Sequence, residues 1–480
     1  MSKNLNIKLK ADQLNAFDEL KKFIHDAESR VFILKGYAGT GKTTMMRVFI
    51  EELEARGIIY CLLASTGRAS KILSNYTHQP TSTVHGRIYT YKGLNQDLDK
   101  MIECKKTEID DTGQLLLNFG LCEAMYDDKI EKTPHFYIID ESSMISDVAD
   151  KHVTQAQFGS GCLLTDLLKY DPKGKFVFVG DVCQLPPIQQ SSSPALSETY
   201  FKEKFHISAI DYELTEIVRQ KGDNDLIDAS KKIRELYYEN PAVKWLKFPL
   251  RGYDSIHIYS DQASFLRSYI NQIKGHTYKD ATLISSSNKN CLTITNLIRP
   301  ALNFNTQRIQ TGDLLLVTQN NYPTGLMNGD MVEIIQIGTR ERRASLTFVQ
   351  VQVKELFTKK DYSLLMIEDI VYGNQTNITQ KQQKELFIDF YLRMKNSGIK
   401  QNDDVFQDEM RKDVYLNALR AVFGYVLTCH KSQGGEWDDV YLDIQKSILF
   451  YERPAVYQWL YTAMTRARKR LHIVDNWWIE

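Results

Sequence analysis

The sequence predicts an α/β protein with two parallel-sheet units, the second of which carries a β-rich insertion. Short apolar strands alternate with helical stretches up to about residue 205, and the same alternation returns after residue 206. Between 306 and 411 the pattern changes to strands of alternating polarity separated by turns, followed by a polar helical stretch. We therefore expect a small β-barrel with a helical extension at 306–411, inserted into a second unit formed by 206–305 and 412–480.

The first unit begins with a strand, a glycine-rich turn and a helical stretch. The strand runs from Val31 to Leu34, and the turn occupies 36–43. Further buried strands are expected at 58–63, 136–139 and 176–179. Strands that alternate with helices form a parallel sheet covered on both faces, so 1–85 and 135–205 should build one such sheet. The stretch 86–134 between them contains a long polar run and should be an insertion.

The second unit contains four apolar runs of the kind that form buried strands. Each is short and bounded by turn or helix signals, as expected for a parallel sheet. The runs lie at 281–287, 424–430, 439–444 and 471–475. They predict a second α/β sheet that is interrupted by the barrel segment.

Composition limits the class of protein. The 480 residues are 43% hydrophobic and 25% charged, which is typical of a folded chain of several domains. Sixty Lys and Arg balance sixty Asp and Glu, so a nucleic acid would have to bind at a local basic stripe. The seven cysteines include no CxxC pair, which favours reduced thiols in the cytoplasm over disulfides or structural zinc. No apolar run approaches the ~18 residues of a membrane span, so we expect neither membrane association nor export.

The glycine-rich turn matches the phosphate-binding pattern GxxxxGK[ST] at every fixed position. Glycines let backbone N–H groups converge on phosphate oxygens, and the helix that follows adds a favourable dipole. Lys42 should reach the β- and γ-phosphates of ATP, and the Thr43 hydroxyl should bind Mg²⁺. The residues expected to bind the nucleotide are Gly36, Ala38, Gly39, Thr40, Gly41, Lys42, Thr43 and Thr44.

A second acidic site separates hydrolysis from phosphate transfer. The apolar strand 136–139 ends in Asp140 and Glu141. Asp140 is suited to hold Mg²⁺, and Glu141 is suited to orient the attacking water. A kinase has less need of a water-polarising glutamate beside the metal site, so the pair favours ATP hydrolysis.

Together with these two sites, further segments resemble the motifs of superfamily 1 helicases of the 5′-to-3′ branch, the RecD-like, Pif1-like and bacteriophage Dda-like enzymes. In chain order the similar segments are 9–13 (LKADQ), 64–69 (ASTGRA), 82–85 (STVH), 140–144 (DESSM), 180–187 (GDVCQLPP), 214–220 (LTEIVRQ), 428–436 (TCHKSQGGE) and 461–468 (YTAMTRAR). The resemblance implies two RecA-like P-loop NTPase cores, with a β-hairpin insertion in the first and the barrel in the second. The sequence departs from the family pattern at Lys10 (usually Thr), Ser65 (usually Pro) and Gly435 (usually Ser).

The resemblance assigns further residues to the nucleotide. It implies that Gln13 hydrogen-bonds the adenine base and that Gln184 senses the γ-phosphate. Arg219 would approach that phosphate from the second core, and Arg466 would act as the arginine finger. Glu436 is implied as a further nucleotide-binding residue. Guanidinium groups that reach the phosphate across a cleft stabilise the dispersed charge only when the cleft closes, so hydrolysis would be coupled to closure.

The same resemblance assigns a single-strand track along both cores. Its residues are Thr66, Thr83 and His85 on the first core and His430, Lys431 and Ser432 on the second. Strand binding without sequence preference combines such backbone contacts with stacking on side chains. If both cores grip one strand, each cycle of closing and opening can move one core along it.

In relatives the insertion after the STVH-like segment forms a pin that splits the duplex. Residues 87–120 could supply it here, with Tyr89, Tyr91 and Phe119 as aromatic candidates that core packing explains equally well. The barrel resembles the domain that in Dda-like enzymes closes over the strand and braces the pin. Its basic cluster of Arg340, Arg342 and Arg343 is better explained as a solvated turn than as a phosphate contact.

We therefore expect a Mg²⁺- and ATP-dependent helicase that translocates 5′ to 3′ on single-stranded DNA and unwinds duplex DNA. Its partners would be single-stranded DNA, DNA forks and single-strand-binding, replication or recombination proteins. We expect a monomer in bacterial or phage-infected host cytosol. Two alternatives stay open: an RNA helicase or RNA-stimulated NTPase of the same superfamily, and an ATP-switched DNA-binding subunit of a recombination complex. Replication, repair and recombination are equally compatible with the sequence.

Overall fold

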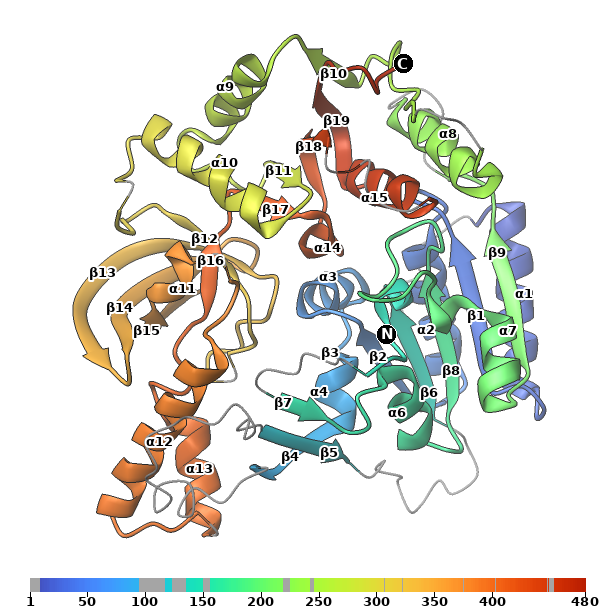
Figure 1. Cartoon of the computed structure of the whole chain (residues 1–480). Coiled ribbons are helices and arrows are strands. Elements are labelled where there is room, and N and C mark those ends of the chain that lie inside the picture. The colour runs from blue at the N-terminus through green and yellow to red at the C-terminus, as the bar shows by residue number, and fades with distance from the viewer. Residues whose placement is uncertain are drawn as a thin grey trace.

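The computed structural model describes residues 9–94, 117–122, 135–149, 156–218, 225–241, 246–305, 307–321, 323–373, 375–401, 403–446, 448 and 453–480. They form two parallel sheets, a five-stranded antiparallel sheet and a three-stranded sheet. Figure 1 shows the first parallel sheet with its helices at the right, the second above, and the antiparallel sheet at the left. None of the helices in these residues has the length and apolar character needed to span a membrane.

The first core is built on a six-stranded parallel sheet with the order β3-β2-β6-β8-β1-β9. Its strands are β1 (Val31–Gly36), β2 (Tyr60–Ala64), β3 (Thr81–Thr83), β6 (Phe136–Asp140), β8 (Lys175–Gly180) and β9 (Ala209–Leu214). Its helices are α1 (Ala11–His25), α2 (Lys42–Ala55), α3 (Gly67–Thr77), α4 (Val84–Ile88), α6 (Leu163–Tyr170) and α7 (Glu198–Tyr200). The predicted end at 205 falls short of the sheet, because β9 pairs with β1 as far as Leu214.

Alternation along β1 explains why this strand reads as an unbroken apolar run. Val31 and Ile33 pack with α6 on one face, whereas Phe32 and Leu34 pack with α1 and α2 on the other. All four side chains are buried. Both faces of the sheet are therefore occupied by packing, and the carboxyl ends of its strands are left for chemistry.

The second core has a five-stranded parallel sheet with the order β10-β19-β18-β11-β17. Its strands are β10 (Ile256–Tyr259), β11 (Ala281–Ser285), β17 (Val426–Thr428), β18 (Trp437–Leu442) and β19 (Ala467–Val474). Its helices are α8 (Leu226–Glu239), α9 (Gln262–Ile273), α10 (Asn288–Ala301), α14 (Cys429–Ser432) and α15 (Ala455–Met464). The four predicted strands of this unit are present, and β10 is an additional strand that the sequence did not reveal. The structure is thus α/β with two RecA-like cores, which confirms the predicted fold class.

The antiparallel sheet has the order β15-β14-β13-β12-β16 and curls into a barrel. Its strands are β12 (Leu314–Val317), β13 (Met331–Arg343), β14 (Leu346–Glu355), β15 (Asp361–Ile367) and β16 (Ala421–Phe423). A bridge between Met366 and Leu419 brings the two edges of the sheet together. The last strand lies beyond the predicted end of the insertion at 411, because the chain returns through the barrel before it re-enters the second core.

The helical extension of the barrel lies against the insertion of the first core. The extension consists of α12 (Gln380–Asn396) and α13 (Asp404–Lys412), which follow α11 (Asp369–Tyr372). The insertion forms the hairpin β4 (Tyr89–Leu94) and β5 (Leu117–Leu121), joined by β7 (Ala156–Phe158). Tyr91 and Leu117 pack on a buried cluster that contains Phe390, Phe406 and Met410 of the two helices. The base of the hairpin predicted in this insertion is therefore present, its middle, 95–116, lies outside the described residues, and its role as a pin stays a prediction.

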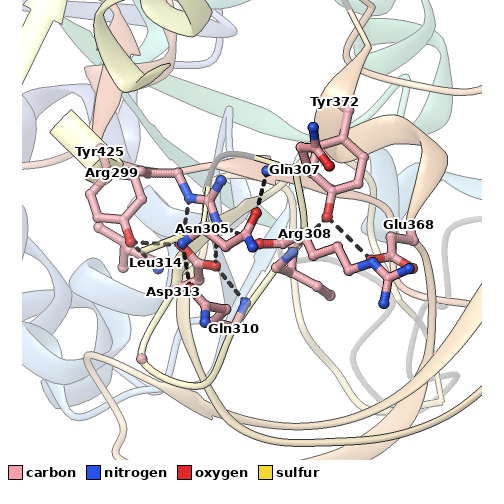
Figure 2. Close-up of polar contacts among 12 residues, drawn as sticks. Arg299, Asn305, Gln307, Arg308, Gln310, Asp313, Leu314, Glu368, Tyr372 and Tyr425 are labelled. Carbon is pink, nitrogen blue, oxygen red and sulfur yellow. Dashed lines mark hydrogen bonds and ion pairs between the residues drawn. The ribbon is translucent and has the colours of Figure 1, made fainter. Parts of the chain in front are cut away.

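A buried cluster of Arg299, Asp313 and Tyr425 links the two connections between the second core and the barrel. Arg299, at the end of α10, donates to both carboxylate oxygens of Asp313 at 2.9 Å, and both side chains are at most 1% exposed. Tyr425, on the returning connection, donates its hydroxyl to Asp313 at 2.9 Å (Figure 2). Polar contacts continue into the barrel, where Tyr372 donates to Glu368 at 3.2 Å.

Candidate nucleotide site and strand track

The glycine-rich turn between β1 and α2 has the backbone that a phosphate cradle needs. Gly39 and Gly41 adopt φ values of 85° and 82°, a left-handed conformation that side chains other than glycine rarely accept. A Cβ on Gly36 would lie 2.6 Å from the Thr40 hydroxyl oxygen, so this position also requires glycine. The hydroxyl of Thr40 donates to the carbonyl of Tyr37 at 2.8 Å and fixes the turn.

The remaining residues of the turn lie beside it. Lys42 folds back and donates to the carbonyls of Gly36 at 2.7 Å and Tyr37 at 3.1 Å. Thr43 is half-buried, and the Thr44 hydroxyl lies 3.2 Å from that of Tyr76. The Lys42 ammonium group is therefore held beside the turn by hydrogen bonds to carbonyl groups of the turn itself.

Carboxylates from the two neighbouring strands converge on the same edge of the sheet. Asp140 ends β6 and Asp181 follows β8, and β6, β8 and β1 are adjacent. Burial and the charge of Glu141 raise the pKa of Asp140 to about 7, although Lys42 acts in the opposite direction. Burial also raises the pKa of Asp181, again opposed by Lys42. Lys42 is thus near both carboxylates.

Glu141 occupies an unusual backbone conformation. Its φ of 51° and ψ of 41° are left-handed, which costs a residue with a Cβ about 1 kcal/mol or more. Its backbone N–H donates to the Asp140 carboxylate at 2.9 Å. This turn directs the chain away from the strand immediately after the two carboxylates, and such strain clusters at functional sites.

Helix α15 of the second core forms the opposite wall. The Tyr461 hydroxyl donates to Asp181 Oδ2 at 2.8 Å and accepts from the backbone N–H of Ala38 at 3.1 Å. The Thr462 hydroxyl accepts from the N–H of Leu185 at 2.8 Å, and the Gln458 amide donates to the Gln184 carbonyl at 3.3 Å. The second core therefore touches both the phosphate turn and the 180–187 loop.

Sequence reasoning assigned no role to Tyr461 or Asp181. Both lie inside segments that resemble family motifs, at 461–468 and 180–187. Membership in those segments was the only signal in the sequence, because the two residues are 280 positions apart.

The predicted arginine finger and the predicted γ-phosphate sensor both lie at this interface. Arg466 follows α15, is 5% exposed, and donates to the Thr462 carbonyl at 3.0 Å and weakly to that of Gly435 at 3.5 Å. These hydrogen bonds lie within the second core. Gln184 is 4% exposed, and its Oε1 has no hydrogen-bond partner among the described residues. Glu436 is exposed at the start of β18.

The N-terminal segment closes the other side of the phosphate turn. Gln13 is 2% exposed, donates to the Thr40 carbonyl at 3.2 Å and accepts from the N–H of Lys10 at 3.1 Å. Lys10 itself donates to the Ile217 carbonyl at 2.8 Å, so the lysine in place of the family threonine joins this segment to the one before Arg219. Arg219 lies outside the described residues, but the neighbouring Val218 N–H donates to the Gly39 carbonyl at 2.9 Å.

On the first core, the predicted strand residues begin two helices. The hydroxyls of Thr66 and Thr83 cap α3 and α4 by accepting backbone N–H groups at 3.2 Å and 3.0 Å. His85 packs against the rings of Tyr89 and Phe158, and burial lowers its pKa to about 4. His85 is therefore neutral at physiological pH and would contact a strand as an aromatic ring rather than as a cation.

On the second core, the turn after β17 meets α3. His430 and Lys431 are half-buried, and burial lowers the pKa of each. Ser432 is fully buried and donates to the Cys429 carbonyl at 2.8 Å, so its hydroxyl is already used. A Cβ on Gly434 would lie 3.5 Å from the Thr66 hydroxyl oxygen, which shows how closely the two cores approach here.

The aromatic and basic candidates outside these motifs are mostly engaged in packing and ion pairs. Tyr89 donates to buried Asp166 at 2.8 Å, and Phe119 stacks on Phe158 with ring centroids 4.7 Å apart. Arg340 forms two hydrogen bonds to Glu368, and Arg343 forms two to Asp389. These two arginines are thus paired with carboxylates, and Arg342 is exposed.

Two family models match the chain. The AAA domain model matches residues 8–247, and the UvrD-like helicase C-terminal domain model matches 423–474. The ATP-dependent RecD2 DNA helicase of Deinococcus radiodurans is 24% identical over 464 residues, covering 96% of this chain and 48% of that protein. The ATP-dependent DNA helicase dda of Enterobacteria phage T4 is 22% identical over 477 residues, covering 95% and 97%. A solved Pif1 helicase from Bacteroides, in complex with ADP-AlF3 and ssDNA, has 16% identity and a TM-score of 0.42 over 96% of this chain and 92% of that one.

Proposed function

We propose that this chain moves 5′ to 3′ along single-stranded DNA and opens the duplex ahead of it. The chain belongs to the AAA domain family and is an ATP-hydrolysing helicase of the Pif1- and RecD-like group of superfamily 1. DNA as substrate is supported by the names of the RecD2 and Dda relatives, which are DNA helicases. The direction is supported by the motifs that resemble the 5′-to-3′ branch.

One observation carries the mechanism: the Tyr461 hydroxyl joins the phosphate turn, Asp181 and the helix that leads to Arg466. A displacement of the turn or of Asp181 on nucleotide binding would therefore be transmitted directly to the second core through Tyr461. Tyr461 lies five residues before Arg466, so docking of α15 and placement of the arginine finger are one event. This supports hydrolysis that is coupled to closure of the cleft.

The residues around the turn fit ATP and Mg²⁺. The glycine backbone leaves room for phosphate oxygens, and Gln184 Oε1 is a buried acceptor without a partner among the described residues. Asp140 and Glu141 are adjacent carboxylates, and Lys42 is a nearby cation that opposes the rise in the pKa of Asp140. Bound Mg²⁺ would neutralise phosphate charge and polarise the reacting phosphoryl group.

Each side chain then has a distinct role. Lys42 would exchange the carbonyls of its own loop for the β- and γ-phosphates, while Thr43 and Asp140 hold the metal ion. Glu141 would orient the attacking water, and Arg466 and Arg219 would stabilise the charge that develops on the transferred phosphoryl group. Gln13 would read the adenine base beside the turn.

The strand would run over α3, α4 and the turn after β17, where the cores meet. Thr66 and Thr83 present helix N-termini, which favour phosphate groups, and His430 and Lys431 flank the same path. The contact of the hairpin with Met410 and its neighbours would brace the wedge against the barrel extension. We propose that the chain acts as a monomer, because this path uses residues of one chain on both sides.

Unwinding of partial duplexes with a single tail tests this proposal. A duplex with a 5′ tail should be opened and its 3′-tailed counterpart should not, and the opposite result would place the chain in the other branch. Hydrolysis stimulated by poly-dT but not by poly-U would favour DNA over the RNA alternative. Lys42→Ala and Glu141→Gln should each abolish stimulated hydrolysis while leaving the thermal unfolding transition in place; near-normal turnover in either variant would refute the assigned site.

A further inference from the structure

Arg68 lies where the two cores and the barrel meet. It belongs to the first turn of α3, two residues after Thr66. Its guanidinium carbon lies 4.4 Å from the centroid of the Trp437 ring, which belongs to the second core. A Cβ on Gly329 of the barrel would lie 3.6 Å from Arg68 Cβ, and the next turn of α3 carries an ion pair between Lys71 and Asp330. Arg68 thus contacts the second core and lies close to the barrel.

The segment that Arg68 contacts also holds Arg466. The Trp437 backbone N–H donates to the Arg466 carbonyl at 2.9 Å, and Arg466 Nη1 approaches the Gly435 carbonyl at 3.5 Å. The segment 435–437 therefore lies between the two guanidinium groups.

Glycine at 435 is what allows this arrangement. A Cβ at Gly435 would lie 2.6 Å from Arg68 Cζ and 2.6 Å from Trp437 Cη2. Both distances are far below van der Waals contact, so any side chain would displace the guanidinium. Glycine, in place of the family serine at position 435, therefore leaves the space that the Arg68 guanidinium occupies.

The Arg68 guanidinium group does not use all of its hydrogen-bond donors on described residues in this position. Its Nη1 is buried without a hydrogen-bond partner in the described part of the chain. Burial lowers the pKa of Arg68 to about 10, Asp330 opposes that effect, and the positive charge of Arg466 adds to it. This conformation therefore leaves a buried donor without a hydrogen bond to any residue that the structure describes, which is unfavourable.

We propose that Arg68 is a positioning residue that couples strand binding on α3 to the placement of Arg466, through Trp437 and Gly435. The inference deepens the proposed function and rests on it. A strand that engages the N-terminus of α3 at Thr66 would shift the first turn of this helix, and Arg68 would pass that shift to the segment 435–437. The arginine finger would then reach its working position only on a chain that carries a strand.

The test compares Arg68→Met with the wild-type full-length chain. We expect the ATPase kcat at saturating poly-dT to fall roughly tenfold or more, while kcat without DNA, KM for ATP and the Kd of a fluorescent dT oligonucleotide change less than about twofold. Arg68→Lys keeps the charge but not the planar stacking group and should recover only part of the stimulation. Arg267→Met, on the exposed face of α9, serves as the control for loss of a surface arginine.

Gly435→Ala provides an independent perturbation, because its methyl group displaces the same guanidinium. It should reproduce the loss of stimulation, and the double variant with Arg68→Met should be no worse than either single variant, since both act on one contact. Gly373→Ala is the matched control, because its nearest neighbour to a new Cβ is 3.5 Å away and its φ is ordinary.

Each other outcome overturns the coupling. Unchanged stimulation in Arg68→Met would show that Arg68 is not part of it. Equal losses with and without DNA would make Arg68 a support of the nucleotide site, and a matching rise in the Kd for DNA would make it a plain strand contact. Additive losses in the double variant would separate the two residues. Absence of stimulation in the wild-type chain would instead reject the proposed function itself.

Discussion

The Tyr461 hydroxyl offers a direct test of how the two cores are joined. Tyr461→Phe removes one oxygen atom and with it the 2.8 Å bond to Asp181 and the 3.1 Å bond from the Ala38 N–H. Asp181 is 1% exposed, so its carboxylate is left short of a donor in a dry environment. The rest of the ring still fills its space, which isolates the effect of the hydroxyl.

The expected magnitude follows from the two lost bonds. A hydrogen bond to a charged group contributes about 1.5–3 kcal/mol, and an unpaired buried N–H costs about 1–3 kcal/mol. The two contributions add to about 2.5–6 kcal/mol, and water that enters the cleft will repair part of this loss, so we expect a net loss of about 2–4 kcal/mol. At about 1.4 kcal/mol for each factor of ten, the docked arrangement becomes roughly 30- to 700-fold less favourable. If docking controls hydrolysis, kcat/KM for ATP in the presence of DNA should fall by a factor in this range.

Steady-state ATPase measurements with saturating poly-dT provide the assay. Burial, followed by the charge of Asp181, raises the pKa of Tyr461 well above its usual range, so the hydroxyl stays protonated and the loss should be the same from pH 7 to pH 9. Tyr60→Phe is a matched control, because that hydroxyl also donates to a carboxylate, that of Glu54, but at the opposite end of the sheet. A kcat/KM for Tyr461→Phe within about threefold of wild type would refute the role of this hydroxyl.

Three further predictions address the finger, the metal site and the hairpin. Arg466→Ala should leave ATP affinity within about threefold but lower hydrolysis at least a hundredfold, as expected for an arginine finger; equal losses in calorimetric binding and turnover would argue against it. Because the pKa of Asp140 is about 7 in the folded chain and near 4 for an unfolded carboxyl, the folded state binds this proton more tightly and loses stability as pH rises from about 4 to about 7. Asp140→Asn should therefore raise the melting temperature at pH 8 but not at pH 4, and an equal gain at both pH values would contradict the shift. Tyr91→Ala should impair strand displacement but not poly-dT-stimulated hydrolysis, since it loosens the hairpin from Met410; a parallel fall in both activities would remove the hairpin from the wedge role.

Local patterns in the sequence were sufficient for the elements that carry the phosphate chemistry. The strand before Gly36 and the strand before Asp140 are central strands, and their unbroken apolar runs follow from burial on both faces. The outer strand β9 was not predicted, because its residues alternate between buried and exposed and end in the segment that we assigned to the second core. Edge strands carry less apolar signal, so the boundary at 205 was placed too early.

Contacts between residues far apart in the chain could not be predicted from the sequence, for a different reason. The bond between Ala38 and Tyr461 spans 423 residues, and no periodicity links such positions. Burial was equally hidden: Ser432 lies in a segment that resembles a strand-binding motif, yet its hydroxyl is bonded within its own turn. Motif membership can name a segment, but only packing decides which of its side chains remain free to act.

The Arg299–Asp313 ion pair has a mechanical consequence. Because Asp313 binds both Arg299 and Tyr425, which lies on the returning connection, we expect a rotation of the second core to carry the barrel and α12 with it. The 17 residues of α12 give this arm a length of about 25 Å, so a tilt of roughly 10° at its base would sweep its tip by about 4 Å. Motion of the second core driven by ATP hydrolysis would thereby be enlarged at the helices that pack against the hairpin.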